Sequence, residues 1–235
     1  MRKYLPFIII VLVLAAAVGG FWMLWKNNSG GETGNSTFTT ANPPVTPGST
    51  ARQSPAALPG ATRPNVKVSS PVVIEEYGDY QCPPCGQLYP ELKQIEAEYR
   101  DQVRVVFHHF PLTKMHKNAM AAARAAEAAR NQNKFWEMHD RLYVNQKAWA
   151  EVDDPLPTFL SYARELKLDV GRFQSDMSSN EVDQRILADM QKGAAAGVTG
   201  TPTVFLDGNM LRYEATNVEG MRQGINLLLS RKATS

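Results

Sequence analysis

The sequence predicts an α/β fold with a large helical insertion, and three observations support it. A β-branched run at 71–77 is followed, after a short turn, by helix-spaced apolar residues over 85–99. A second apolar strand follows at 103–107, and strand–helix–strand order gives a parallel pair with a right-handed crossover. A third strand is predicted only at 203–206, before a hairpin turn and a closing helix.

The gap between the second and third strands is far longer than a crossover requires. It runs over 111–200, whereas a parallel connection needs only about a dozen residues. Its apolar spacing is helical, so we expect a helical subdomain inserted at about 113–197. The helices predicted there span 117–132, 135–148, 157–168 and 181–196.

The first 25 residues have the composition of a membrane anchor. Arg2 and Lys3 precede an uncharged apolar run over 5–25, which as a helix measures about 31 Å and would cross a bilayer core of roughly 30 Å. We predict a transmembrane helix at 1–25, with a cytoplasmic N-terminus and the folded domain on the extracytoplasmic or periplasmic side of the cell membrane. A cleaved signal peptide is the alternative, because Ala15–Ala17 resembles a small-residue cleavage site.

Residues 26–65 have the composition of a disordered linker. Of these 40 residues, 22 are Gly, Pro, Ser or Thr and four are charged, so the segment cannot bury enough apolar surface to fold. The folded domain is expected at 66–235. The formal net charge is only +2 and no basic stripe is present, so we expect no nucleic-acid partner.

Cys82 and Cys85 are the only cysteines, and they form a Cys-Pro-Pro-Cys motif at the predicted turn into the first helix. A cysteine at a helix N-terminus meets unpaired backbone N–H groups and the positive end of the helix dipole, which stabilise the nucleophilic thiolate. Pro83 fits the first turn of a helix. The second cysteine lies three residues on, on the same helical face, so the pair can close and open a disulfide.

A zinc site and a purely structural disulfide are the alternatives for this motif. Zinc needs three or four protein ligands, so His108, His109 or His116 would have to complete the site. A disulfide across so short a loop restrains the unfolded chain little. We therefore favour a redox centre, and we expect neither a metal nor a cofactor.

A second feature is the segment Gly200-Thr201-Pro202-Thr203, directly before the third strand. Proline does not fit inside a central strand, but at a strand start it can adopt the cis form and present the preceding backbone outward. On its own this pattern indicates only a proline in a loop.

Residues from about 70 to 231 resemble the DsbA-like branch of the thioredoxin superfamily. Three segments carry the resemblance in the family's order: 73–85 around the cysteines, the Phe-Trp-Glu-Met-His-Asp helix at 135–140, and 197–205 before and into the third strand. The resemblance implies a thioredoxin-like fold with an inserted helical subdomain and a thiol:disulfide oxidoreductase activity.

The resemblance also implies roles for individual residues. It makes Cys82 the exposed nucleophile and Cys85 the buried resolving thiol. It makes Pro202 a cis-proline that faces the cysteines, with Thr201 and Pro202 contacting the substrate. The family also keeps a buried acid beneath the active site, and Glu76 matches that position.

A carboxyl group in an apolar pocket has a raised pKa, so a buried Glu76 could exchange a proton with Cys85. A surface glutamate is the alternative. The alternation of side chains along the strand does not decide between Glu75 and Glu76; only the resemblance does.

These features predict an enzyme that oxidises the thiols of exported proteins. A quinone-linked membrane partner would reoxidise it, and the N-terminal anchor would keep it near that partner. Pro84 stands where the most oxidising family members carry a histidine, so we expect a moderate reduction potential, between about −270 and −120 mV. A disulfide reductase or isomerase, and a redox-inactive chaperone-like binding module, are the alternatives.

Overall fold

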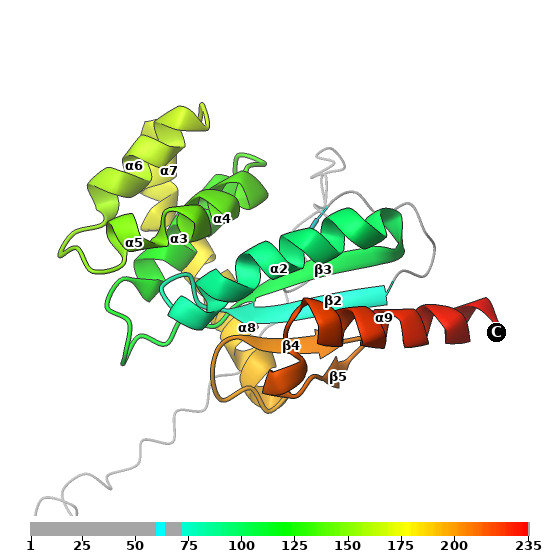
Figure 1. The fold of residues 1–235 in the computed structure, drawn as a ribbon. Coiled ribbons are helices and arrows are strands. Elements are labelled where there is room, and N and C mark those ends of the chain that lie inside the picture. The colour runs from blue at the N-terminus through cyan, green and yellow to red at the C-terminus, as the bar shows by residue number, and fades with distance from the viewer. Residues whose placement is uncertain (1–59, 64–71, 235) are drawn as a thin grey trace, which may run out of the picture. The chain divides into compact units, whose positions relative to one another are not determined.

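The computed structural model describes residues 60–63 and 72–234. In this part of the chain five strands form one sheet in the order β1-β3-β2-β4-β5 (Figure 1). The predicted anchor at 1–25 and most of the predicted linker lie outside the described residues. Within those residues, no helix is both long and apolar enough to span a bilayer. The strands are β1 (Ala61–Thr62), β2 (Val72–Gly78), β3 (Val103–His109), β4 (Thr203–Leu206) and β5 (Asn209–Met210).

The central strand β2 fixes the geometry of the sheet. It pairs in parallel with β3, as the strand–helix–strand order predicts, and antiparallel with β4 on its other side. Glu76 lies opposite Phe107 of β3 and Val204 of β4. The return strand β5 contributes only Asn209 and Met210, because the chain turns into a 3₁₀ segment at Tyr213–Ala215.

The edge strand β1 corrects one boundary of the predicted linker. Ala61 and Thr62 pair antiparallel with β3, although composition assigns them to the linker. The following residue, Arg63, forms ion pairs with Glu96 at 2.8 Å and with Asp140 at 2.9 Å. A strand of two residues is too short to show alternation in the sequence, so only its pairing with β3 reveals it.

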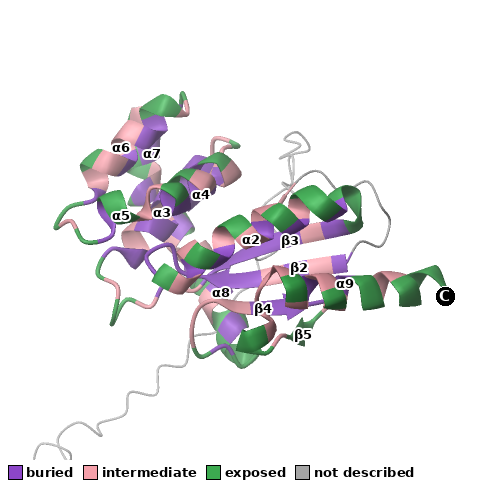
Figure 2. Cartoon of the chain, in the orientation of Figure 1, coloured by how far each residue is buried: buried purple, intermediate pink, exposed green. Residues whose placement is uncertain are grey.

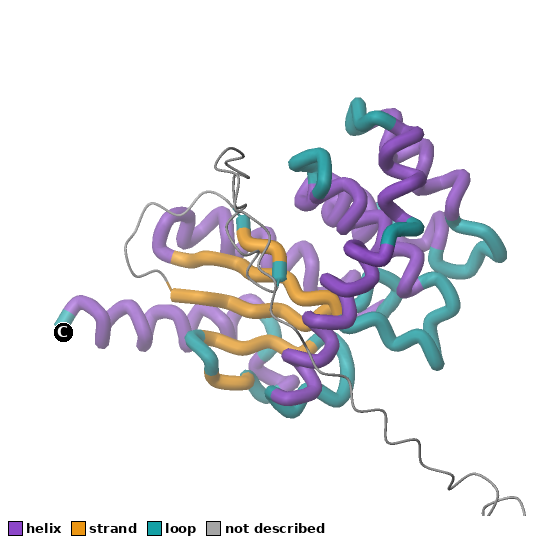
Figure 3. Tube along the Cα trace, turned by 180° about the vertical axis from the view of Figure 1, so that it is seen from behind, coloured by secondary structure: helices purple, strands orange, loops and turns teal. Residues whose placement is uncertain are grey.

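Helices cover both faces of the sheet (Figures 1 and 3). On one face lie α2 (Pro83–Tyr99) and α9 (Val218–Ala233), and on the other lies α8 (Asn180–Ala195), which packs against β3. The alternation along β2 sends successive side chains to opposite faces. The core on the α2 and α9 face includes Val72, Ile74, Leu88, Ile95, Val105, Val204, Met221 and Ile225. Figure 2 shows this burial along the strands and the inner faces of the helices.

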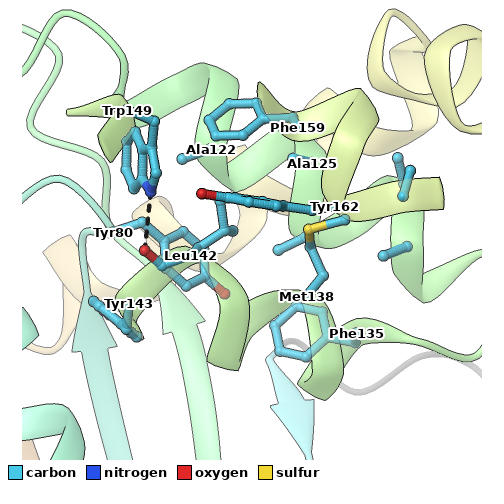
Figure 4. Packing of buried hydrophobic residues seen from close by; sticks show 14 of the residues in the cluster. Tyr80, Ala122, Ala125, Phe135, Met138, Leu142, Tyr143, Trp149, Phe159 and Tyr162 are labelled. Atoms are coloured by element: carbon cyan, nitrogen blue, oxygen red, sulfur yellow. Dashed lines mark hydrogen bonds between the residues drawn. The ribbon is translucent and has the colours of Figure 1, made fainter. Parts of the chain in front are cut away.

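The insertion between β3 and β4 forms a helical layer beside the sheet (Figure 1). Its first helix is rich in alanine, and its buried alanines let neighbouring helices approach closely. Trp149 is fully buried within this layer, where its indole N–H donates to the Leu142 carbonyl at 2.9 Å (Figure 4). The helices of this layer are α3 (Ala119–Arg130), α4 (Phe135–Val144), α5 (Gln146–Trp149), α6 (Leu156–Glu165) and α7 (Val170–Met177), and α8 of the same insertion packs on the sheet.

The predicted thioredoxin-like α/β fold with inserted helices is confirmed, with one helix added. The short α7 lies in a stretch where the sequence predicts no helix. It is capped by the Asp169 side chain, which accepts a hydrogen bond from the Arg172 N–H, and it buries only Phe173 and Met177. Two apolar residues are too few to establish a helical period.

Candidate active site

The two cysteines lie where the turn after β2 enters α2. Cys82 is the N-cap residue of α2, with extended backbone angles of φ −67° and ψ 120°. Its carbonyl accepts the first helical hydrogen bond from Gly86 N–H at 3.1 Å. Pro83 occupies the first turn, where a missing N–H leaves no carbonyl unpaired. The helix therefore starts where the motif predicts, with Cys82 beside its positive end.

Both thiols are covered, and this corrects the expectation that Cys82 is exposed. Cys85 is fully buried and Cys82 is only 4% exposed. The loop before β4 lies over the nucleophile: the Thr201–Pro202 peptide is cis, and the Thr201 carbonyl accepts a hydrogen bond from the Cys82 thiol at 3.3 Å. The Thr201 hydroxyl is buried without a hydrogen-bond partner. The backbone carbonyl of Thr201 thus contacts the Cys82 thiol, and the Thr201 side chain lies near enough to lower the pKa of Cys82.

The two thiols differ strongly in acidity. A hydrogen bond from the Cys85 side chain lowers the pKa of Cys82 to about 6, against the opposing effect of burial. Burial raises the pKa of Cys85 well above its usual value of 9, and its contact with Cys82 and the charge of Glu76 raise it further. Above about pH 6, Cys82 therefore loses the proton that its thiol form donates to the Thr201 carbonyl, whereas Cys85 stays a thiol.

The structure separates Glu76 from Glu75, which alternation alone could not do. Glu76 lies on the α2 face of β2, is 2% exposed, and has one carboxyl oxygen buried without a partner. Burial, with smaller effects from the charges of Cys82 and Glu96, raises the pKa of Glu76 to about 8. Glu75 points to the opposite face, where Lys192 pairs with it at 2.7 Å. The acid that the resemblance favours is thus the one beneath the cysteines.

A buried carboxylate holds the turn that leads to Cys82. Asp79 accepts hydrogen bonds from the backbone N–H of Gln81 at 2.8 Å and of Leu112 at 2.9 Å. The same carboxylate lies 2.7 Å from Nδ1 of His116. Asp79 therefore ties the active-site turn to the chain that leaves β3.

Side chains of the insertion complete this support. Gln81 accepts a hydrogen bond from the Asn118 N–H at 2.6 Å and donates to the Ala150 carbonyl at 2.5 Å. The Gln146 amide donates to the carbonyls of Tyr80 at 2.7 Å and of Cys82 at 2.9 Å. The helical insertion thus holds the backbone on both sides of Cys82.

Comparison with known families decides the wider assignment. The family model described as thioredoxin matches residues 67–226, which is more than half of the chain. The chain belongs to the thioredoxin family.

Curated relatives of this thioredoxin-family chain carry the name of a transporter. The chain is 36% identical over 156 residues to Na(+)/H(+) antiporter NhaA 1 of Salinispora arenicola, a match that covers 66% of this chain and 23% of that protein. It is 37% identical, with the same coverage, to Na(+)/H(+) antiporter NhaA 3 of Salinispora tropica. The match spans less than a quarter of these relatives, so it does not carry their transport activity to this chain.

Solved structures of thiol–disulfide oxidoreductases share its fold. A thioredoxin-like oxidoreductase of Silicibacter pomeroyi matches with a TM-score of 0.58 at 24% identity, over 73% of this chain and 92% of that one. BdbD of Bacillus subtilis matches with a TM-score of 0.62 at 18% identity, over 73% of this chain and 93% of that one. DsbA of Xylella fastidiosa matches with a TM-score of 0.59 at 19% identity, over 74% of this chain and 92% of that one. The predicted DsbA-like thioredoxin fold is confirmed.

In this thioredoxin-family domain, the histidines considered as zinc ligands have carboxylate partners. Across residues 60–63 and 72–234, no three His, Cys, Asp or Glu side chains are grouped so as to hold a metal ion. The ring-nitrogen contacts are His108 with Asp189 and Glu75, His109 with Glu127, and His116 with Asp79.

Sequence analysis did not identify the residues that support the cysteines. Asp79 and Gln81 lie within the family-like segment around the motif, but polar residues in a turn are common and indicate no particular partner. Asn118 and Gln146 lie 37 and 64 residues from their partners in the turn and carry no local signal at all. Only the folded insertion brings them to the turn that holds Cys82.

Proposed function

We propose that this protein is an extracytoplasmic thiol–disulfide oxidoreductase that oxidises the thiols of other proteins through Cys82 and Cys85. The observation that carries the proposal is the inequality of the two thiols. The pKa of Cys82 is lowered to about 6 at the helix N-terminus, whereas Cys85 is fully buried with a raised pKa. One sulfur thus suits attack and departure as a thiolate, and the other suits proton exchange.

The exchange proceeds in two displacements. A substrate thiolate attacks Sγ of Cys82 in the oxidised pair, the Cys82–Cys85 bond breaks, and Cys85 leaves as a thiolate that takes a proton from Glu76. A second substrate thiolate then attacks the substrate sulfur of the mixed disulfide and displaces Cys82. The substrate has lost two electrons, the pair has gained them, and Cys82 is a good leaving group because its pKa is low.

The electrostatics also support the oxidising direction. Stabilising the Cys82 thiolate stabilises the reduced form, and this makes the disulfide a stronger oxidant. Pro84 supplies no cation beside the thiolate, so we expect a reduction potential between about −270 and −120 mV. A quinone-linked membrane protein would remove the electrons. We place substrate contacts at Thr201 and Pro202, whose loop covers Cys82.

The test measures the reduction potential of the Cys82–Cys85 pair and the redox state of that pair in cells. Equilibration of the full chain with glutathione buffers gives the reduction potential. Alkylation of thiols in growing cells gives the state of the pair. A pair held mostly oxidised supports the oxidase. A pair held mostly reduced would make the protein a reductase or isomerase, and a pair that resists dithiothreitol in the native state would leave only a binding module.

We further propose that residues 1–25 anchor the protein in the cell membrane, that 26–59 form the flexible tether, and that the catalytic domain lies outside the cytoplasm. The charge and apolar pattern of the first 25 residues support this arrangement. Protease added to spheroplasts should release a soluble domain by cutting within the tether. A protein recovered entirely in the soluble extracytoplasmic fraction would instead mean that the first segment is a cleaved signal peptide.

A further inference from the structure

A tyrosine of the helical insertion reaches the interior beneath the cysteines. Tyr143 of α4 is 5% exposed, and its hydroxyl is buried without a hydrogen-bond partner. Figure 4 shows its ring beside that of Tyr80, and the two centroids are 4.9 Å apart. A buried hydroxyl without a partner is costly, so its position calls for a function.

The Tyr143 hydroxyl lies directly against Gly78 of β2, which has no side chain. A Cβ atom on Gly78 would stand 2.9 Å from the hydroxyl oxygen and closer still to the ring of Phe107. The hydroxyl therefore occupies the place that a side chain at position 78 would take. Glycine is required here because the aromatic groups approach the backbone so closely.

That place is next to Glu76. Residues 76 and 78 point to the same face of β2, and neighbouring side-chain places on one face are about 6.6 Å apart. Glu76 has its own buried carboxyl oxygen without a partner. A glutamate side chain is long enough to bring this oxygen toward the hydroxyl. Cys85 belongs to the same buried cluster as Tyr143, and the charges of Glu76 and Cys85 both act on the Tyr143 hydroxyl.

The surroundings of Glu76 contain little else that could stabilise its anion. The charges that act on it are those of Cys82 and Glu96, and both are negative. On β3, His109 of the same face is engaged with Glu127. The titratable groups that face this interior include Cys85, Tyr89 and Glu96 from α2, Tyr143 and His139 from α4, Asp79, Tyr80 and Cys82 from the turn before α2, and His109 from β3.

We propose that Tyr143 is a positioning residue for thiol exchange: its hydroxyl donates a hydrogen bond, directly or through one water, to the Glu76 carboxylate after Glu76 has given its proton to Cys85. This rests on the proposed function. Burial keeps the pKa of Tyr143 well above 10, so the hydroxyl retains its proton and acts as a donor. The inserted subdomain thereby contributes to the chemistry as well as to the support of the turn.

The test is the titration of Glu76 in the oxidised full chain, where neither cysteine has a proton to release. Carboxyl ¹³C NMR follows the titration, and the Glu76→Gln variant assigns the signal. In Tyr143→Phe the anion loses its donor, so the titration should move upward by about one pH unit. Tyr162→Phe makes the same change at a buried tyrosine of the insertion whose ring contacts Phe159, and it should leave the titration unchanged.

A second variant keeps the shape of the side chain. Fluorinated tyrosine at position 143 has a more acidic hydroxyl, so it should move the Glu76 titration downward. This measurement remains available if Tyr143→Phe does not fold. A Glu76 titration that responds to neither change, or that responds to Tyr80→Phe instead, would overturn the proposal.

The inference and the proposed function fail in different ways. The NMR titration contains no substrate, so it reports on the hydrogen bond even if the protein does not oxidise thiols. If the wild-type chain does not oxidise a reduced test protein, the proposed function is wrong, but the titration of Glu76 still tests the hydrogen bond from Tyr143. If the chain oxidises the test protein but the Glu76 titration does not respond to the changes at Tyr143, only the role of Tyr143 is wrong.

Discussion

Glu75 and Glu76 are neighbours in the chain, yet they lie on opposite faces of the sheet in opposite electrostatic surroundings. Burial alone would raise the pKa of Glu75, but its contacts with Lys192 and His108 lower it below 4.5. Burial without a cation raises the pKa of Glu76 to about 8. The same kind of side chain is therefore a carboxylate at neutral pH on one face and titrates near pH 8 on the other.

The difference extends to the groups around each acid. On the α8 face, His108 is fully buried between Glu75 and Asp189, and Lys192 lies 3.2 Å from its Nε2. Each charge there has an opposite or hydrogen-bonding neighbour, which is what burial of charge requires. On the α2 face, Glu76 has no such partner. This comparison suggests that a missing counter-charge can mark a functional acid.

The largest expected effect is at the cysteines. Cys82→Ser should abolish exchange, because Cys85, the other thiol, is fully buried and has a raised pKa. Cys85→Ser should accumulate mixed disulfides through Cys82, because the resolving thiol is gone. Non-reducing electrophoresis after acid quenching reads both results. Trapping of substrate on Cys85 in Cys82→Ser would reverse the roles.

The next effect is kinetic and contrasts the two acids directly. Glu76→Gln should slow exchange by roughly 100-fold, because glutamine cannot give a proton to Cys85 or take one from it. The pKa of the Cys82 thiolate should change less. Stopped-flow exchange across about pH 5 to 9 and the pH dependence of alkylation measure the two quantities.

Glu75→Gln is the matched control for that substitution. It makes the same chemical change one residue away, on the face without cysteines, and it should leave the exchange rate and its pH profile unaltered. Equal slowing by both variants would mean that the substitutions act through the strand rather than through the buried proton, and the contrast between the faces would be lost.

A third prediction concerns stability and pH. The raised pKa of Glu76 means that the folded protein binds this proton more tightly than the unfolded chain does. The resulting stability is fully present below pH 4.5 and is lost as pH rises through about 8. Glu76→Gln removes this loss, so at about pH 8 the reduced variant should be more stable than the wild type, on the order of 2–4 kcal/mol.

Urea unfolding of the reduced proteins at about pH 5 and about pH 8 checks this prediction. The difference between the variant and the wild type should grow with pH. Glu75→Gln should show the opposite sign, because the pKa of Glu75 is lowered and its stability is present at higher pH. A difference for Glu76→Gln that does not vary with pH would show that its proton is not held as described.

The smallest effect is expected at Lys192 on the opposite face. Lys192→Met removes the ion pair with Glu75, in which the Lys192 side chain is 41% exposed. Partly exposed pairs contribute about 0–1 kcal/mol, so unfolding should be affected only slightly. Exchange kinetics should not change. A slower exchange in this variant would show that the two faces are coupled.

Much of the fold could be predicted because its signals are local. The β-branched run of β2, the apolar spacing of α2 and the strand at 203–206 are all periodic over a few residues. The start of α2 at Cys82 follows from the proline that comes next. By contrast, β1 and α7 contain too few apolar residues to show a period, and they exist through pairing, capping and packing.

By itself, the sequence determined that a Cys-x-x-Cys pair begins a helix after a buried strand, because helix caps and side-chain periods are properties of adjacent residues. Only the tertiary structure decided the rest of the site. It buried Glu76, rather than Glu75, on the face of the sheet that carries the cysteines. It also covered Cys82 with the Thr201 carbonyl and brought Tyr143 to the space above Gly78. Each of these depends on contacts between segments far apart in the chain, and no local pattern encodes such contacts.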